Sequence, residues 1–228
     1  MYKTGERRGE ERNMKKRVIS KEELRGRLLK IFGLDEPILI SEIIDVWKEY
    51  SRPRVYQLLN EMQDDGSIAK GDPGIYYIPT TTPNGERSVL SRESVIEKRF
   101  ICHEGDIFGY YSGPTLLNRL GLTTEAPEET ELVTSNASAK IRRIKVCDLE
   151  IVVRRSKVPI NKKNAYALML LEVFTELQRS LEGDEMEIIK NFVSFRNVKE
   201  DDILRNSRYF PLCTLKVILE TGLKNIFE

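Results

Sequence analysis

The sequence predicts an α+β protein: an N-terminal winged helix-turn-helix followed by a mixed α/β domain that ends in helices. Two observations predict this class. Apolar side chains recur with helical spacing three times before residue 66 and again after residue 160. Short runs rich in β-branched and aromatic residues, bounded by turn formers, lie at 67–79 and 131–154. A helix-strand-helix order of this kind is typical of an α+β domain.

The first helix is predicted to run from Ser20 to about Phe32. Ser20 and Glu23 form a capping box, in which each side chain can satisfy a free backbone N–H. Apolar residues then recur at the spacing of one helix face: Leu24, Leu28 and Ile31. Gly33 ends the helix.

A second and a third helix follow closely. Residues 37–40 form a brief extended stretch, after which we expect Ser41 to cap a helix. Its buried stripe consists of Ile43, Ile44, Trp47 and Tyr50. The third helix begins near Arg52-Pro53, because proline suits a first helical turn, and ends at Gly66. Its predicted core face is Val55, Leu58, Leu59 and Met62.

A two-stranded hairpin completes this unit. Ser67–Lys70 and Ile75–Pro79 are the predicted strands, and Gly71–Gly74 supplies the turn between them. Three short helices, a tight turn between the second and third, and a terminal hairpin make the winged helix-turn-helix plan. We therefore predict this domain over residues 20–80. In that plan the third helix enters the major groove of DNA and the hairpin lies against the DNA backbone.

The predicted outward face of the third helix carries side chains that suit double-stranded DNA. These candidate DNA-binding residues are Arg52, Arg54, Tyr56, Gln57 and Asn60, with Lys70 on the hairpin. Arginine pairs with guanine, glutamine and asparagine pair with adenine, and tyrosine hydroxyls bind phosphate. Acidic residues gather at the other end of the helix, at 61–65. Two alternatives stay open: a winged helix used for protein docking, and a solvent-exposed Lys70 without a partner.

The N-terminal arm, residues 1–19, is rich in lysine and arginine and has no hydrophobic period, so we expect it to be flexible. The net charge of the whole chain is only +1, which argues against nucleic-acid binding unless the charge is unevenly distributed. The arm is one such local excess. It is equally consistent with a terminus that has no function.

The second domain is predicted over residues 87–228, after a polar turn-forming boundary at 80–85. Ser91 caps a helix to about Phe100, and a short helix follows through Leu116–Leu120. The predicted strands are Glu131–Thr134, Ile141–Val146 and Leu149–Arg154. A long helix then opens at Asn161 or Asn164 and reaches Leu181, a second follows Gly183-Asp184, and the last starts at Pro211.

The sequence gives little support to an enzyme or a membrane protein. His103 is the only histidine, and a metal site beside Cys102 would need carboxylates such as Glu104 and Asp106, without the paired spacing of zinc sites. We predict no catalytic residue, no metal and no cofactor. No apolar run approaches the roughly 20 residues that span a bilayer. Three scattered cysteines suggest a reducing compartment, so a cytoplasmic location is expected.

A group of basic residues falls on the last predicted hairpin: Arg142, Arg143, Lys145, Arg154, Arg155 and Lys157. They can form a patch for nucleic acid or an acidic partner. A charged hairpin edge that prevents aggregation is the other interpretation, and it is slightly favoured.

The second domain also shows a resemblance. Ser112-Gly113, followed by Leu117–Pro127, resembles the AbiEi-type antitoxins of bacterial type IV toxin–antitoxin systems, in which a winged helix with a wing like Gly74–Pro79 comes first. The resemblance covers about residues 20–180. It implies a repressor of its own operon that binds inverted repeats in promoter DNA, and a cognate nucleotidyltransferase-like toxin that it opposes without necessarily forming a stable complex. The C-terminal domain would carry the antitoxin activity.

The expected partner is therefore double-stranded promoter DNA, with two copies paired on the inverted repeat and a monomer or weak dimer in solution. The rival interpretation is a protein-interaction module that neutralises a toxin by direct contact.

Overall fold

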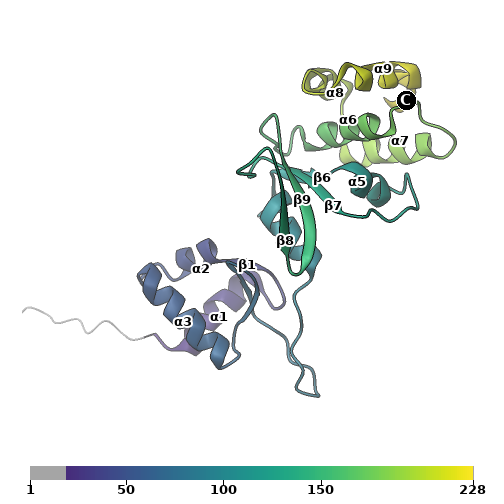
Figure 1. Cartoon of the computed structure of the whole chain (residues 1–228). Helices are drawn as coiled ribbons and strands as arrows, with labels where there is room; N and C mark the ends of the chain where they lie inside the picture. The colour runs from purple at the N-terminus through teal and green to yellow at the C-terminus, as the bar shows by residue number, and fades with distance from the viewer. Residues whose placement is uncertain (1–18, 228) are drawn as a thin grey trace, which may run out of the picture.

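The computed structural model describes residues 19–227 of the chain (Figure 1). The protein is a mixed α+β molecule, which confirms the predicted class. The N-terminal helices lie at one end, the C-terminal helices at the other, and a β-sheet lies between them (Figure 1). The predicted basic arm falls almost wholly outside the described residues. Within residues 19–227, no helix is long and apolar enough to cross a membrane.

The N-terminal part combines helices with a small antiparallel sheet. Its helices are α1 (Lys21–Phe32), α2 (Ile40–Val46) and α3 (Arg52–Asp64). Its strands are β1 (Ile38–Leu39), β2 (Ala69–Asp72) and β3 (Ile75–Tyr77), in the order β1-β3-β2. The extended stretch before α2 therefore adds a third strand to the predicted hairpin. The strand β2 also extends further into the predicted turn, with an irregular register between Lys70 and Asp72.

The helix ends follow local chemistry, with one correction. Ser20 Oγ accepts a hydrogen bond from the Glu23 N–H at 3.2 Å, and Gly33 after α1 has φ 88°. The prediction that Ser41 caps α2 is wrong, because α2 begins at Ile40 and Ser41 lies within its first turn. The carboxylate of Glu42 takes the capping role instead: its Oε2 accepts from the Leu39 N–H at 2.6 Å.

The N-terminal helices enclose their own apolar core. The four predicted core residues of α3 are all buried: Val55, Leu58, Leu59 and Met62. Trp47 is fully buried after α2, and its indole N–H donates to the Leu24 carbonyl oxygen at 3.3 Å. Burying a large aromatic side chain while satisfying its polar atom fixes α2 against α1.

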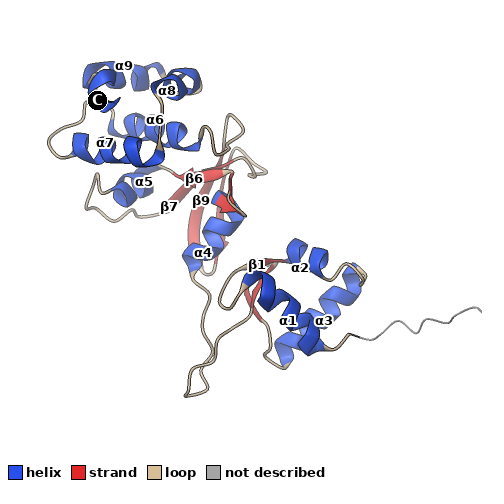
Figure 2. Ribbon diagram, turned by 180° about the vertical axis from the view of Figure 1, so that it is seen from behind, coloured by secondary structure: helices blue, strands red, loops and turns tan. Residues whose placement is uncertain are grey.

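The second part begins with a helix that runs directly into a hairpin. The helix α4 (Arg92–Ile96) continues as a π-helical turn, η1 (Glu97–Ile101), and the short strands β4 (Cys102–His103) and β5 (Asp106–Ile107) follow. The residues around His103 therefore form a tight hairpin. Seen from behind, α4 lies in front of the larger sheet, near the end of the sheet that is closer to the N-terminal part (Figure 2).

The larger sheet has the strand order β6-β7-β9-β8. Its strands are β6 (Gly109–Tyr111), β7 (Thr130–Thr134), β8 (Ile141–Val146) and β9 (Leu149–Arg155). The pair β7–β9 is parallel, whereas β6–β7 and β8–β9 are antiparallel. The helix α5 (Gly113–Leu120) connects β6 to β7 and ends at Gly121 in the left-handed conformation, φ 77°. The three strands predicted after residue 130 are all present.

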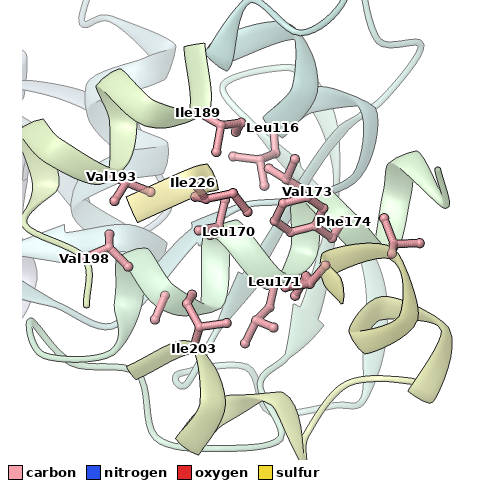
Figure 3. Packing of buried hydrophobic residues seen from close by; sticks show 13 residues of the cluster. Leu116, Leu170, Leu171, Val173, Phe174, Ile189, Val193, Val198, Ile203 and Ile226 are labelled. Atoms are coloured by element: carbon pink, nitrogen blue, oxygen red, sulfur yellow. The ribbon is translucent and has the colours of Figure 1, made fainter. Parts of the chain in front are cut away.

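Helices form the C-terminal end of the molecule. They are α6 (Ala165–Leu177), α7 (Glu185–Arg196), α8 (Glu200–Ser207), α9 (Leu212–Thr221) and α10 (Leu223–Phe227). Their buried faces meet around Leu171 and Phe174 of α6 (Figure 3). The prediction that the first of them reaches Leu181 is wrong, because Gln178 adopts a left-handed conformation, φ 52°, directly after Leu177.

The tip of the β2–β3 hairpin packs against the second part of the chain. Asp72 is 8% exposed, and its carboxylate accepts from the backbone N–H of Cys147 at 3.0 Å and from Arg99 Nη1 at 2.6 Å. Ile75 and Tyr77 join an apolar cluster with residues of α4 and the larger sheet. The boundary predicted at 80–85 is a polar loop, yet the two parts share a buried contact.

Candidate nucleic-acid interface

The structure exposes every side chain proposed for DNA contact. The exposed residues of α3 are Arg52, Arg54, Tyr56, Gln57 and Asn60, and Lys70 is exposed on β2. They are outward because the apolar residues of α3, at i, i+3, i+4 and i+7, hold the opposite face against α1 and α2. The helix thus presents a continuous polar face to solvent.

The first turn of α3 concentrates positive charge. Arg52 and Arg54 lie there, beside backbone N–H groups that a helix leaves without intrahelical partners. Ser51 occupies the capping position, but its side chain makes no hydrogen bond to these groups. The helix dipole adds a partial positive charge at the same end. Basic residues at a helix N-terminus are repelled by the positive end of the helix dipole, so this arrangement lowers the stability of the helix. The same concentration of positive charge favours the binding of an anion.

Two acidic residues at the other end of α3, Glu61 and Asp65, are paired within the protein. The Nζ atom of Lys21, on α1, lies 3.2 Å from Glu61 Oε2 and 3.5 Å from Asp65 Oδ2. The hydrogen bond to Glu61 raises the pKa of Lys21. Arg54 Nη1 also donates to Glu61 Oε1 at 3.3 Å and to Gln57 Oε1 at 3.3 Å. In the structure, Arg54 is therefore held along the helix by two neighbours.

The exposed Lys70 shares a sheet face with a residue that lies near α3. Lys70 and Tyr76 are directly opposite each other across β2 and β3, so their side chains point to the same side. Tyr76 packs into the N-terminal core. Burial, and to a smaller extent the charge of nearby Tyr56, raises the pKa of Tyr76. Lys70 thus lies on the side of the small sheet that faces α3.

The hairpin tip differs from what the sequence suggested. The winged-helix plan places this hairpin against the DNA backbone, but here its tip contacts the protein itself. The backbone of Gly71 accepts a hydrogen bond from Cys147 Sγ at 3.3 Å, next to the buried Asp72. Lys70 is left as the hairpin residue that is free to meet a phosphate.

A polar cluster that no sequence motif marks joins the two parts. Glu42 is 9% exposed, and its Oε1 lies 2.9 Å from Lys98 Nζ and 3.1 Å from His103 Nε2. Glu104 also approaches, but Asp106 does not, and its carboxylate lies 3.6 Å from Lys162. The Lys98 ammonium already neutralises Glu42 and would repel a metal ion. This cluster fits a structural role, because Glu42 caps α2 and also pairs with Lys98 and His103 of the second part.

The basic residues of the β8–β9 hairpin do not form one patch. Successive strand residues point to opposite faces, so Arg142 and Arg143 are separated. Arg143 forms a bidentate ion pair with Glu129, whose pKa the Arg143 hydrogen bond lowers. Lys145 pairs with Asp148, and Arg154 pairs with Glu131. With much of the positive charge locally neutralised, the surface favours a solvated hairpin edge.

Comparisons with known proteins add nothing to these observations: no protein-family model matches the chain, and no curated protein matches it significantly.

Proposed function

We propose that this protein is a DNA-binding transcriptional regulator whose residues 20–80 form a winged helix-turn-helix. In this proposal α3 enters the major groove, with Arg52 and Arg54 leading, and Lys70 contacts the DNA backbone beside it. The hairpin tip has no DNA contact, because it is covered by the second part of the chain. The observation that carries the proposal is the exposed, cationic first turn of α3. At the other end of the helix, Glu61 and Asp65 pair with Lys21.

The residue types on this face fit the chemistry of base reading. Gln57 and Asn60 follow Arg54 at intervals of three residues, so they lie on one side of the helix. An arginine with a bidentate contact to guanine and an amide with a bidentate contact to adenine each discriminate between bases by about 1–3 kcal/mol. Tyr56 is 47% exposed and suits a phosphate contact.

The resemblance to AbiEi-type antitoxins extends the proposal. It makes the protein a cytoplasmic bacterial repressor of its own toxin–antitoxin operon, bound as two copies to inverted repeats. The opposed toxin would be a nucleotidyltransferase-like protein encoded beside it, and the protein itself would not be an enzyme. A nucleotidyltransferase gene directly adjacent to this gene would support that extension.

Fluorescence anisotropy with labelled duplex DNA from upstream of the gene tests the DNA-binding proposal. The double variant Arg52→Ala/Arg54→Ala is compared with Arg205→Ala/Arg208→Ala, which removes the same charge from exposed positions on and just after α8. We expect the α3 variant to lose roughly tenfold or more in affinity and the control to bind normally. Equal binding by all three proteins would remove α3 from the interface.

A second candidate function, toxin neutralisation by direct contact, is favoured by exposed leucines at the C-terminal end. Leu212 and Leu219 are 83% and 71% exposed, seven residues apart and thus on one face of α9. Co-purification with the neighbouring gene product at high salt, where DNA contacts are lost, would favour this function. Loss of that complex in the double variant Leu212→Ser/Leu219→Ser would place the toxin-binding surface on α9.

A further inference from the structure

A cavity of about 210 Å³ lies far along the chain from α3, between the larger sheet and the C-terminal helices. Strands β6, β7 and β9 form one wall, α6 forms another, and residues 209–211 before α9 close a third side. Apolar side chains line much of it: Val133, Val158, Leu168 and Phe210. Bulk water fills about 30 Å³ per molecule, so the space exceeds what one or two bridging waters occupy.

Two buried polar groups face this cavity without hydrogen-bond partners among residues 19–227. Glu172 of α6 is 8% exposed, and its carboxylate accepts no hydrogen bond. Tyr110 of β6 is 4% exposed, and its hydroxyl also lacks a partner. Neither oxygen is sealed from the cavity, so both are open to a ligand that enters it; the fully buried atom without a hydrogen-bond partner on this lining is Arg154 Nε.

One arginine faces three carboxylates near the inner end of the cavity. The nearest cation to Glu172 is Arg154, whose Nη2 is 3.6 Å from Glu172 Oε1. That same Nη2 atom is already 2.7 Å from Glu131 Oε2 and 3.2 Å from Ser112 Oγ. Glu176, one turn after Glu172, adds another carboxylate to the lining. Burial raises the pKa of Glu172 to about 7, although Arg154 acts in the opposite direction. A bound proton therefore offsets part of the excess negative charge near neutral pH.

The mouth of the cavity has the opposite character. Arg155 and Lys157 are exposed there, and neither forms an ion pair within the described part of the chain. Lys157 Nζ donates to the Tyr209 carbonyl oxygen at 3.0 Å, which leaves two of its donors free. Arg143 and Arg154, on the same hairpin, are by contrast paired with carboxylates. The cavity is thus acidic at its closed end, apolar along its walls and basic at its mouth.

We propose that this cavity binds a free amino acid with an apolar side chain. The ammonium group of the ligand lies between the Glu172 carboxylate and the Tyr110 hydroxyl, and adds a second cation where one arginine is shared by several carboxylates. The carboxylate lies at the mouth with Arg155 and Lys157. The side chain packs along Val133 and Leu168. A molecule that carries both charges matches both ends of the cavity, whereas a simple amine or acid matches one.

Isothermal titration calorimetry of the full-length protein with leucine and phenylalanine tests the proposal. Two fragments serve as comparisons: 3-methylbutylamine lacks the carboxylate, and 4-methylpentanoate lacks the ammonium. We expect the amino acids to bind more tightly than either fragment. Absence of binding by both amino acids, or tighter binding of a mononucleotide such as GMP, would overturn the assignment of the ligand.

Variants separate the two ends of the site. Glu172→Gln keeps the shape of the protonated carboxyl group and removes the charge, so the fold is retained while amino-acid affinity falls roughly tenfold or more. Lys157→Met weakens binding of leucine but leaves that of 3-methylbutylamine unchanged. The matched control is Glu187→Gln at an exposed position on α7, which binds as the wild type does. Unaltered affinity of Glu172→Gln would show that the ligand, if bound, lies elsewhere.

Discussion

Arg54 and Glu61 are joined along the exposed face of α3, with Arg54 Nη1 3.3 Å from Glu61 Oε1. Seven residues separate them, which is about two helical turns. The arginine proposed to lead into the major groove is thus paired with a carboxylate in the free protein. DNA binding would have to exchange this carboxylate for a phosphate or a base, and the exchange makes Glu61 a natural regulator of affinity.

Replacing Glu61 with glutamine is expected to strengthen DNA binding. The variant frees Arg54 from an exposed ion pair worth on the order of 0.5–1 kcal/mol, so affinity rises about two- to fivefold. It also removes the pair between Glu61 and Lys21, which lies at the far end of α3. Anisotropy titrations of wild type and Glu61→Gln on the same duplex measure the change. Glu86→Gln, an equal charge change in the exposed loop before α4, is the control and leaves affinity unaltered. Weaker binding by Glu61→Gln would mean that Glu61 orients Arg54 rather than competing for it.

Lys70 is expected to contribute one phosphate contact. Lys70→Ala should weaken binding to specific and non-specific duplexes by the same factor, and reduce the slope of log affinity against log salt concentration by about one. Titrations at several salt concentrations provide the slope. Lys140→Ala, at an exposed position before β8, should leave it unchanged. A change of sequence preference in Lys70→Ala would instead place this side chain at a base edge.

Asp72 is expected to be important for stability, because it satisfies two partners across the contact between the two parts. Asp72→Ala leaves the Cys147 N–H and the Arg99 guanidinium without their acceptor, and should lower the free energy of unfolding by about 2–3 kcal/mol. Urea denaturation measures the loss. Asp45→Ala, at an exposed position on α2, should stay within about 0.5 kcal/mol of the wild type. Similar curves for both variants would show that the hairpin tip contact adds little.

The buried Glu172 predicts a pH dependence of stability. Its folded-state pKa of about 7 exceeds the ordinary value of 4.5, so the folded state binds the proton more tightly than the unfolded state does. The contribution of this group to the free energy of unfolding is therefore complete below pH 4.5. It is lost as the pH rises towards 7, which lowers the free energy of unfolding by about 3 kcal/mol.

Urea denaturation of wild type and Glu172→Gln at about pH 5 and about pH 8 checks this expectation. The variant does not titrate at this position, so it should gain stability relative to the wild type at the higher pH. Glu187→Gln is the matched control. Parallel pH profiles for wild type and Glu172→Gln would contradict the expected protonation.

Local signals along the sequence predicted most of the elements near them. Ser20 and Glu23 mark the start of α1 because a cap uses neighbouring residues. The core face of α3 follows from the spacing of Val55, Leu58, Leu59 and Met62 alone. The same spacing predicted the exposed face of α3, because the residues of a surface helix that lie outside its core stripe point towards solvent.

Several other errors came from elements without a strong local marker. The end of α6 was missed because Gln178, not a glycine, adopts the left-handed conformation. The helices α8 and α10 were not predicted at all. The acidic first turn of α8, Glu200–Asp202, was the one available signal for it, since acidic residues favour a helix N-terminus.

Long-range contacts were beyond the reach of such signals. Glu42 and His103 are far apart in sequence, and only the packing of the two parts brings their side chains within 3.1 Å. The cavity beside Glu172 likewise joins strands, a helix and a late loop. The sequence predicts that Glu172 lies on a helix. The residues near it in the chain do not indicate that its carboxylate lacks a hydrogen-bond donor across the cavity.

The buried tip of the β2–β3 hairpin has a consequence for the connectivity of the molecule. Ile75 and Tyr77 share an apolar cluster with Val95 and Tyr111, on the far side of the exposed loop that joins the halves. A nick at residues 82–86 would break the covalent link and leave that cluster intact. The two fragments would then co-elute under native conditions and separate only in denaturant, like two subunits of a heterodimer.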